Sequence, residues 1–417
     1  MFEFPKSLLP ILGVVLLSLS WRLSADLDIP GADGSDGVFA PSESVVIDLS
    51  LAPTASWDSP SSGYGVYDPD KWAVVFKYTS VDIPAGVTVS FLNHDSRAPV
   101  VWLVGGDVTI DGALTLNGND YVATAAAYAE PGPGGYAGGL GYQNTTSPSS
   151  GGQGMAGGSQ GAVGGSHATA GQNNTYPLYG NPRVLPLVGG SGGGGDVNAV
   201  IGGAAGGGAL LLAVGGELSV NGYITAKGGL GINSGCCAYY SAGSGSGGAI
   251  RLIAEKVTGS GYIHAVGGTV NAGGAGRIRI EARDVYANWD VQPAATVVSP
   301  DTSVQLWLPT IAPQVEIISI ATVDVPSDPH ARYEPGQEDL NIDLQSGDSV
   351  IELQTHNVNT SSSETVVQVR ITPEYGAPFY VDAHYDSGDD TEATWIATAT
   401  LPTGYFTVQA HAINPEP

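Results

Sequence analysis

This sequence has few cysteines, few basic residues and almost no long apolar segments. The 417 residues include only two cysteines, Cys236 and Cys237, which are too few for a disulfide framework. Lysine and arginine number 14 against 40 acidic residues, so the formal net charge is −26. A surface this acidic repels nucleic acid and anionic lipids, and we expect no nucleic-acid partner.

The one continuous apolar run lies at the N-terminus. It covers residues 8–21, follows Lys6, and is succeeded by small residues within 23–25. A membrane-spanning helix takes about 20 apolar residues, so we interpret residues 1–25 as a cleaved signal peptide and expect no transmembrane segment after it. Glu3 offsets the charge of Lys6, which leaves a retained N-terminal anchor as the alternative. Export predicts an extracellular or cell-surface location.

Glycine is abundant, and the rest of the composition limits the classes of protein that this abundance could indicate. There are 61 glycines, about twice the average usage, which is near 7%. Because 42% of the residues are hydrophobic, a chain that is disordered throughout is not expected. The glycines also lack a strict three-residue period, which excludes collagen.

The chain repeats a short unit in which a strand, a glycine, a second strand and a second glycine follow one another. Copies begin at residues 81, 108, 218 and 257. Each copy adjoins a further apolar strand with a period of two, so that Ile250, Leu252 and Ala254 share one face. Units of three short strands that stack on their copies predict a parallel β-helix. The Asn-Gly and Asp-Gly dipeptides at the corners leave an antiparallel sandwich of hairpins as the alternative.

The repeats define the larger organisation of the chain. We predict an N-terminal capping segment at residues 26–72 and a glycine-rich parallel β-helix at residues 73–307. A stretch rich in glycine, serine and asparagine interrupts the repeats at residues 121–208. Long connections of this kind are either functional or disordered, and we expect a flexible surface insertion here.

Composition changes again at residues 308–313, where glycine becomes scarce and threonine, valine and aspartate increase. About seven short runs of alternating apolar residues follow, separated by proline, glycine and aspartate. Seven short strands in about 100 residues are typical of an immunoglobulin-like β-sandwich. We therefore predict such a sandwich at residues 308–417, without the cysteine pair of antibody domains.

Three stretches carry a resemblance to known proteins: residues 78–89, 105–112 and 245–280. They resemble glycine-rich secreted β-helix proteins of bacteria, within the pectate-lyase-like superfamily, over roughly residues 30–290. The resemblance implies export, a cell-surface or extracellular setting and a right-handed parallel β-helix. The expected fold is therefore all-β, a right-handed parallel β-helix followed by the immunoglobulin-like β-sandwich predicted above. The catalytic motifs of pectate lyases and polygalacturonases do not match positions in this chain, so no catalytic residues are carried over.

Basic residues gather in the last predicted coils. Six of the 12 that remain after residue 25 lie between residues 227 and 283. Alternation places Arg251, Arg277 and Arg279 on the outer face, where they could bind an anionic glycan. The competing interpretation is an ion-pair ladder in which Glu255 and Glu281 neutralise the arginines.

Tyr223 and Tyr262 occupy equivalent positions in two successive repeats. Their rings should therefore stack on an outer face, where they either stabilise the coil or offer a platform to a sugar ring. Both tyrosines belong, with the three arginines, to the predicted anionic-glycan site.

Two further pairs of residues carry specific expectations. Asp33 and Asp36 lie in an aspartate-rich turn and are candidate calcium ligands, with solvated turn residues as the plainer interpretation. Calcium is the one cofactor considered. Because exported proteins meet oxidising conditions, Cys236 and Cys237 are expected to form a vicinal disulfide. Intermolecular bridges and a reduced pair are the alternatives.

These observations lead to three functional hypotheses. The first is an exported, non-enzymatic structural or adhesive protein with a β-helical stiff spacer and a C-terminal sandwich that mediates contact or anchoring. The second is a polysaccharide-binding or polysaccharide-degrading protein, either a lyase or a glycoside hydrolase. The third is a self-assembling extracellular fibre subunit, because a terminal coil has an open edge. The expected partners are an extracellular polysaccharide and further copies of the chain.

Overall fold

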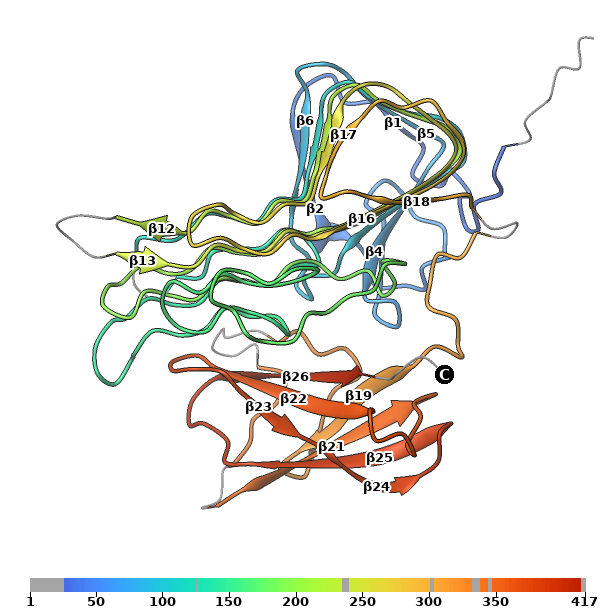
Figure 1. The fold of residues 1–417 in the computed structure, drawn as a ribbon. Helices are drawn as coiled ribbons and strands as arrows, with labels where there is room; N and C mark the ends of the chain where they lie inside the picture. Colours follow the sequence, from blue (N-terminus) through green and yellow to red (C-terminus); the bar gives the residue numbers. More distant parts are fainter. Residues whose placement is uncertain are drawn as a thin grey trace, which may run out of the picture.

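The computed structural model describes residues 26–124, 127–234, 240–300, 304–331, 338–343 and 347–413. Within these ranges the regular structure is almost entirely strand, and the single exception is a short 3-10 helix, η1 (Leu49–Leu51). The predicted all-β class is therefore confirmed (Figure 1). None of the helical structure in the described part of the chain is long and apolar enough to cross a membrane.

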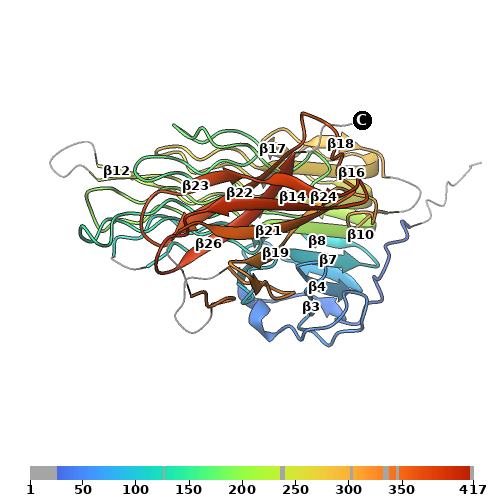
Figure 2. The same cartoon turned by 90° about the horizontal axis from the view of Figure 1, so that it is seen from below.

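Two sheets built mainly from parallel strands run through residues 38–298. Sheet A consists of β1 (Val38–Phe39), β3 (Val66–Asp68), β4 (Ala73–Tyr78), β5 (Ser80–Ile83), β7 (Val100–Val104), β8 (Val108–Ile110), β10 (Ala209–Val220), β14 (Ala249–Thr258), β16 (Arg277–Val285) and β18 (Thr296–Val298). Sheet B consists of β2 (Val45–Asp48), β6 (Thr88–Leu92), β9 (Ala113–Thr115), β11 (Tyr223–Thr225), β15 (Tyr262–His264) and β17 (Asp290–Gln292). Successive passes of the chain stack in order, as the ladder from β3 to β18 in Figure 2 shows.

Rows of apolar side chains, one from each pass, form the core between the sheets. One row runs across sheet B in register through Val45, Val89, Leu114, Ile224, Ile263 and Val291. Its four inner members are 0% exposed, whereas the two end members are half-buried. Complete burial of such a side chain contributes about 1.5–3 kcal/mol to stability. Each copy of the sequence repeat therefore adds one stabilising side chain to the row.

A second apolar cluster covers the outer face of sheet A. Leu27 and Ile29, from the predicted capping segment, pack there together with Val304 and Leu306. The strands of sheet A contribute Val75, Val101, Leu211 and Ile253 to this cluster. Much of the outer face of sheet A is therefore buried by other parts of the chain and does not face solvent.

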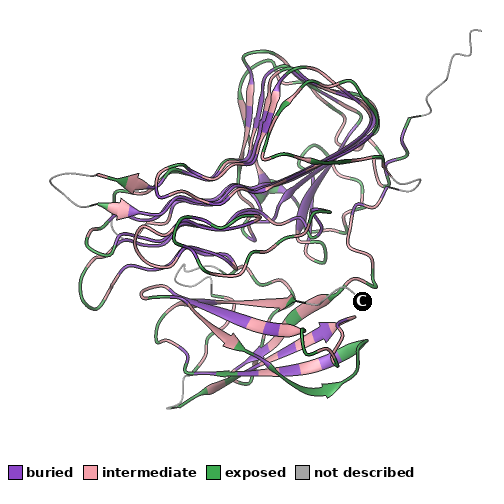
Figure 3. Cartoon of the chain, in the orientation of Figure 1, coloured by how far each residue is buried: buried purple, intermediate pink, exposed green. Residues whose placement is uncertain are grey.

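The glycine-rich segments between the strands pack together into one body. We call this body the glycine-rich bundle; it comprises residues 116–124, 127–208, 226–234, 240–248 and 265–276. Its backbones are joined directly, since the Gly190 amide donates to Gly207 O at 2.8 Å and the Gly207 amide donates to Ser246 O at 2.9 Å. The Gly247 amide in turn donates to Gly274 O at 2.9 Å. Buried residues run through the bundle (Figure 3), so the stretch at 121–208 is not a loose surface loop.

Glycine is required in the bundle because neighbouring backbones leave no room for a side chain. A Cβ atom added at Gly206 would lie 1.9 Å from the carbonyl oxygen of Gly190. One added at Gly247 would lie 1.9 Å from the carbonyl oxygen of Ala265. Backbone amides and carbonyls that are buried this deeply must bond to each other, and glycine permits the close approach.

The strands after residue 313 pair in antiparallel fashion and form two further sheets. One contains, in spatial order, β20 (Val323–Asp324), β19 (Gln314–Ile320), β21 (Ser349–His356), β25 (Glu392–Ala399) and β24 (His384–Gly388). The other contains β23 (Phe379–Asp382), β22 (Val366–Pro373) and β26 (Phe406–Ile413). Both sheets contribute side chains, including Leu353, Val369 and Trp395, to one separate apolar core.

Arg370, on β22, joins these C-terminal sheets to the glycine-rich bundle. Its side chain is 0% exposed. The guanidinium donates hydrogen bonds to three carbonyl oxygens of the bundle, those of Gly152, Gly154 and Gly157. The rings of Tyr176 and Tyr380 lie 5.5 and 6.0 Å from its Cζ atom, within cation–π range. The two parts of the chain are therefore held by a buried cation.

Candidate functional site

The structure places the predicted arginines beside one another but pairs them with a glutamate. Arg251 on β14 lies opposite Arg279 on β16. Glu281 accepts a hydrogen bond from each, at 2.7 Å from Arg251 Nε and 2.8 Å from Arg279 Nε, through the same oxygen, Oε1. Arg251 is 3% exposed and Glu281 is 7% exposed. Arg251 is thus internal and Arg279 is half-buried, and one buried carboxylate serves both.

The other basic residues of this sheet are engaged in similar ways. Arg283 Nη1 donates to Glu255 Oε2 at 2.8 Å, which continues the ladder that alternation predicted. Arg277 Nη2 donates to the carbonyl oxygen of Tyr179 in the glycine-rich bundle at 3.3 Å. Burial lowers the pKa of Arg277. These residues connect strands and bundle, and they do not form an open cationic face.

Removing Glu281 should destabilise the protein strongly. A Glu281→Ala variant leaves two arginines without a shared buried acceptor, and loss of one partner from a buried ion pair costs about 3–5 kcal/mol. Urea unfolding measures the change. Glu217→Ala, which breaks the exposed pair with Lys256 at 2.8 Å, is the control and should leave the free energy of unfolding nearly unchanged. Equal effects of the two substitutions would show that Glu281 has no special structural role.

The two predicted tyrosines do stack, but on the other sheet. The rings of Tyr223 and Tyr262 lie 4.8 Å apart at an interplanar angle of 6°. They belong to β11 and β15 of sheet B, whereas the arginines belong to sheet A, and the apolar core lies between the sheets. The chain turns between β14 and β15, so residues that are close in sequence emerge on different sides. The arginines and tyrosines therefore do not form one site.

The tyrosine stack has polar neighbours that were not among the predicted site residues. The Tyr262 ring lies 4.7 Å from the His264 ring, and Lys227 Nζ lies 5.5 Å from the Tyr262 centroid. Asp290 Oδ2 lies 3.1 Å from His264 Nε2. These side chains come from three successive passes of the chain, since Lys227 follows β11, His264 lies on β15 and Asp290 lies on β17. The repeat alignment could have identified them. Because Tyr223, His264 and Lys227 all lie close to the Tyr262 ring, the arrangement favours stabilisation of sheet B over sugar stacking.

The aspartates considered for calcium bind backbone amides. Asp33 Oδ1 accepts from the Ser35 amide at 2.9 Å. Asp36 accepts from the amides of Gly63 at 2.6 Å and Lys77 at 2.7 Å. Within the described ranges, no three His, Cys, Asp or Glu side chains come together as a group that could hold a metal ion. Calcium binding at this turn stays a prediction.

The adjacent cysteines lie outside the described residues. Cys236 and Cys237 fall between β12 (Ile232–Asn233) and β13 (Ser241–Ala242), in the undescribed range 235–239. The expected vicinal disulfide stays a prediction.

His167 is the most deeply buried histidine and lies within the glycine-rich bundle. Its Nδ1 donates to the carbonyl oxygen of Gly247 at 2.9 Å, and its ring stacks on Tyr179 at 4.6 Å. Burial, with a smaller contribution from the charge of nearby Arg277, lowers the pKa of His167 to about 4. The imidazole is therefore neutral at physiological pH and acts as a structural group.

Acid should destabilise the fold through His167. The unfolded chain binds a proton near pH 6.5 and the folded chain near pH 4, so stability falls as the pH drops through this window, by up to about 3 kcal/mol. Urea unfolding of a His167→Gln variant between pH 4 and 7 should show a shallower loss than the wild type. His384→Gln, on exposed strand β24, should retain the wild-type pH dependence. Identical slopes for the His167 variant and the wild type would contradict this expectation.

A cavity that the sequence did not predict lies in the C-terminal part. Its volume is about 1320 Å³, and it is lined by β19, β26 and residues 338–342, with Pro69 and Asp70 from the N-terminal part. Apolar side chains such as Ile317 and Val408 alternate in its lining with acidic ones such as Glu316. No short motif could reveal it, because its walls come from segments far apart in the chain.

Comparison with known proteins adds no family to this description. The chain matches no protein family model, no curated protein and no solved structure. Its function is therefore inferred from its own residues and geometry.

Proposed function

We propose that the chain is an exported, non-enzymatic structural or adhesive protein of the cell surface or extracellular matrix. In this proposal the strands of sheets A and B form a right-handed parallel β-helix that serves as a stiff spacer. The antiparallel strands after residue 313 form an immunoglobulin-like sandwich that mediates contact or anchoring. The observation that supports this function is that the side chains predicted to bind a ligand interact with one another instead. Glu281 joins two arginines, and Tyr223 stacks on Tyr262.

Stiffness is supported by the way the parts are joined. In-register rows of buried side chains connect the passes of sheet B. Backbone hydrogen bonds connect the glycine-rich segments with each other, and buried Arg370 connects the bundle to the C-terminal sheets. A body in which each part is fixed to its neighbours transmits position and force better than domains on a flexible linker.

Localisation and glycan chemistry together test the proposal. Fractionation of the cell that produces the protein should place it outside the cytoplasm, with the mature chain beginning at Asp26. The purified chain should leave neutral and acidic polysaccharides intact after prolonged incubation. Retention in the cytoplasm would contradict the export, and shortened or unsaturated glycan products would contradict the non-enzymatic role.

The fibre hypothesis depends on how well the two ends of the sheets match. Sheet A ends at β18 with a parallel edge strand. At its other end sheet A has two edge strands: β1, which is parallel to β5, and β3, which runs antiparallel to β4 and pairs in turn, through Tyr67, with Thr54. Stacking of identical copies would bring unlike edges together at β3, which favours a separate molecule over a fibre subunit. Electron microscopy showing filaments of the purified protein would reverse this preference.

A further inference from the structure

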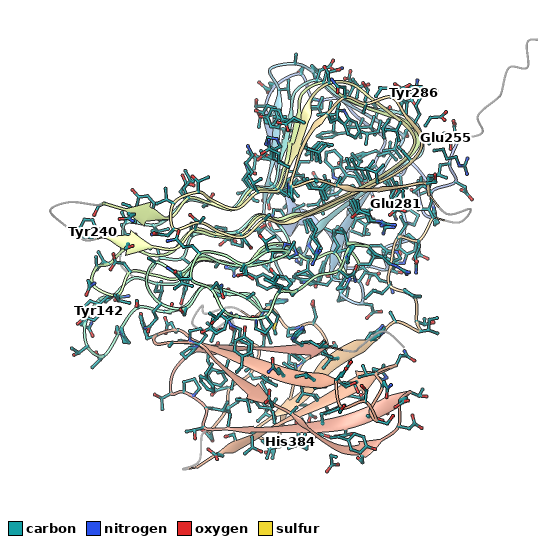
Figure 4. The ribbon with its side chains drawn as sticks, in the orientation of Figure 1. Tyr142, Tyr240, Glu255, Glu281, Tyr286 and His384 are labelled. Carbon is teal, nitrogen blue, oxygen red and sulfur yellow. The ribbon has the colours of Figure 1, made fainter. Side chains whose placement is uncertain are left out.

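The far end of the glycine-rich bundle carries a cluster of loops that the proposed spacer does not use. We call these the tip loops, and they comprise residues 119–123, 141–147, 196–201, 230–233 and 240–242. The Tyr121 amide donates to Leu230 O at 2.9 Å, and the Tyr142 amide donates to Asp196 O at 2.9 Å. Figure 4 shows Tyr142 and Tyr240 together at this end, and Figure 1 shows β12 and β13 there.

The tip loops are fixed by buried polar groups beneath them. The Asp196 side chain, which is 1% exposed, accepts from the amides of Asn198 at 2.7 Å and Ser241 at 2.6 Å. Asn271 Nδ2 donates to the carbonyl oxygens of Ile232 at 2.8 Å and Ala242 at 2.9 Å. Loops held in place before binding lose little conformational freedom when they engage a ligand. The tip is therefore built as a preorganised surface.

The exposed part of the tip is mainly aromatic and aliphatic, and its one exposed charged side chain is the acidic Asp120. Tyr240, Leu230, Val197 and Val200 are 39%, 42%, 46% and 40% exposed. The remaining surface consists largely of amide and hydroxyl residues, among them Asn144, Thr145, Thr146 and Asn198. The tip loops contain no Lys, Arg, His or Glu, and their two aspartates are Asp196, which is buried, and Asp120, which is exposed. Loops rich in Tyr, Ser, Gly and Asn are typical of protein surfaces that bind ligands.

We propose that the tip loops bind an uncharged glycan. This proposal rests on the adhesive function proposed above and names its contact surface. Tyrosine and aliphatic side chains can pack against the C–H faces of a sugar, while amides and hydroxyls can bond its hydroxyl groups. Because the tip has no cation to pair with a carboxylate or sulfate, and the chain carries a net charge of −26, an acidic glycan is disfavoured.

A protein partner is the competing occupant of the same loops. A stable protein interface takes about 800 Å² from each partner and is centred on anchors rich in Arg, Met and aromatic residues. The tip is the end of five short loops, which contain tyrosine but no Arg, Met or Trp. These features favour the smaller ligand.

Dextran and dextran sulfate provide a matched pair of probes that differ in charge, and cello-oligosaccharides and mannan extend the neutral set. The mature full-length chain should be retained on at least one neutral probe and not on dextran sulfate. A Tyr142→Ala/Tyr240→Ala double variant should lose at least about tenfold in affinity. The single variant Asn198→Ala should weaken binding to a smaller extent.

The matched control is Tyr64→Ala/Tyr286→Ala, which removes two tyrosines that are 55% and 69% exposed elsewhere on the molecule. It should bind like the wild type, and all variants should keep the wild-type melting temperature. Absent retention of the wild type on neutral probes, retention on dextran sulfate alone, or full retention by both tip variants would overturn the tip proposal. If the chain is nevertheless found outside the cell, only the tip proposal fails. Retention in the cytoplasm would instead overturn the proposed function.

Discussion

Replacing Gly206 with alanine should prevent the glycine-rich bundle from forming its native packing. The new Cβ atom would lie 1.9 Å from Gly190 O and 2.3 Å from Gly190 C, both backbone atoms that cannot move aside alone. Forced insertion of a methyl group into close-packed structure typically costs about 1–3 kcal/mol, and we expect the upper end or more here. Urea unfolding followed by circular dichroism and by tyrosine fluorescence would measure the loss.

Gly105 provides the matched control for this substitution. It lies on the loop between β7 and β8, and a Cβ atom there would come no closer than 3.4 Å to another atom, Ala32 O. Gly105→Ala should therefore change stability by less than about 1 kcal/mol. Unfolding of Gly206→Ala at the same urea concentration as Gly105→Ala would contradict the direct packing of backbones in the bundle.

Arg370→Ala should separate the C-terminal sheets from the glycine-rich bundle. The substitution leaves the carbonyl oxygens of Gly152 and Gly157 without the donor that lies 3.0 and 3.1 Å away, and it removes the cation from between two tyrosine rings. Hydrogen bonds to a charged group contribute about 1.5–3 kcal/mol each, so a total loss of about 4 kcal/mol is expected. Unfolding should change from one transition to two.

Two further variants make this result specific to the buried guanidinium. Arg370→Lys keeps the charge, but its ammonium group lacks the planar set of donors with which a guanidinium bonds several carbonyl groups. It should therefore restore only part of the stability. Arg183→Ala removes an exposed arginine of the same bundle and should behave like the wild type. An Arg370→Ala protein that still unfolds in one transition at wild-type stability would disprove the role of Arg370 in joining the C-terminal sheets to the glycine-rich bundle.

The sequence predicted the features that repeat from one pass of the chain to the next. Internal repeats stack on one another, so equivalent positions become neighbours, and this predicted both the pairing of Arg251 with Arg279 and the stacking of Tyr223 on Tyr262. Period-two alternation likewise identified Ile250 and Leu252 as core residues. The same reasoning could not predict that the arginines and the tyrosines belong to different sheets, because that depends on where the chain turns between strands.

Features that depend on contacts between distant segments could not be predicted from the sequence. Leu27 and Val304 lie close to the two ends of the first part of the chain, yet both cover the outer face of sheet A. In the sequence Arg370 has the pattern of an ordinary strand residue, because the carbonyl groups that accept its hydrogen bonds lie more than 200 residues earlier. The apolar run at 340–344 is one of the seven runs whose alternation predicts strands after residue 313, but its described residues, 340–343, do not form a strand. Glycine content without a period likewise indicated a loose insertion where the backbones in fact pack closely.

The bundle imposes an order on folding. Its segments leave the sheets at three separate points, between β9 and β10, between β11 and β14, and between β15 and β16. Gly190, Ser246 and Gly274 can meet only when these three passes are already stacked, and contacts between residues so far apart in sequence form slowly. A chain exported unfolded and N-terminus first would therefore complete its sheets while the glycine segments still exchange their amide protons freely with water. The tip, at the far end of the bundle, would then be the last surface to form.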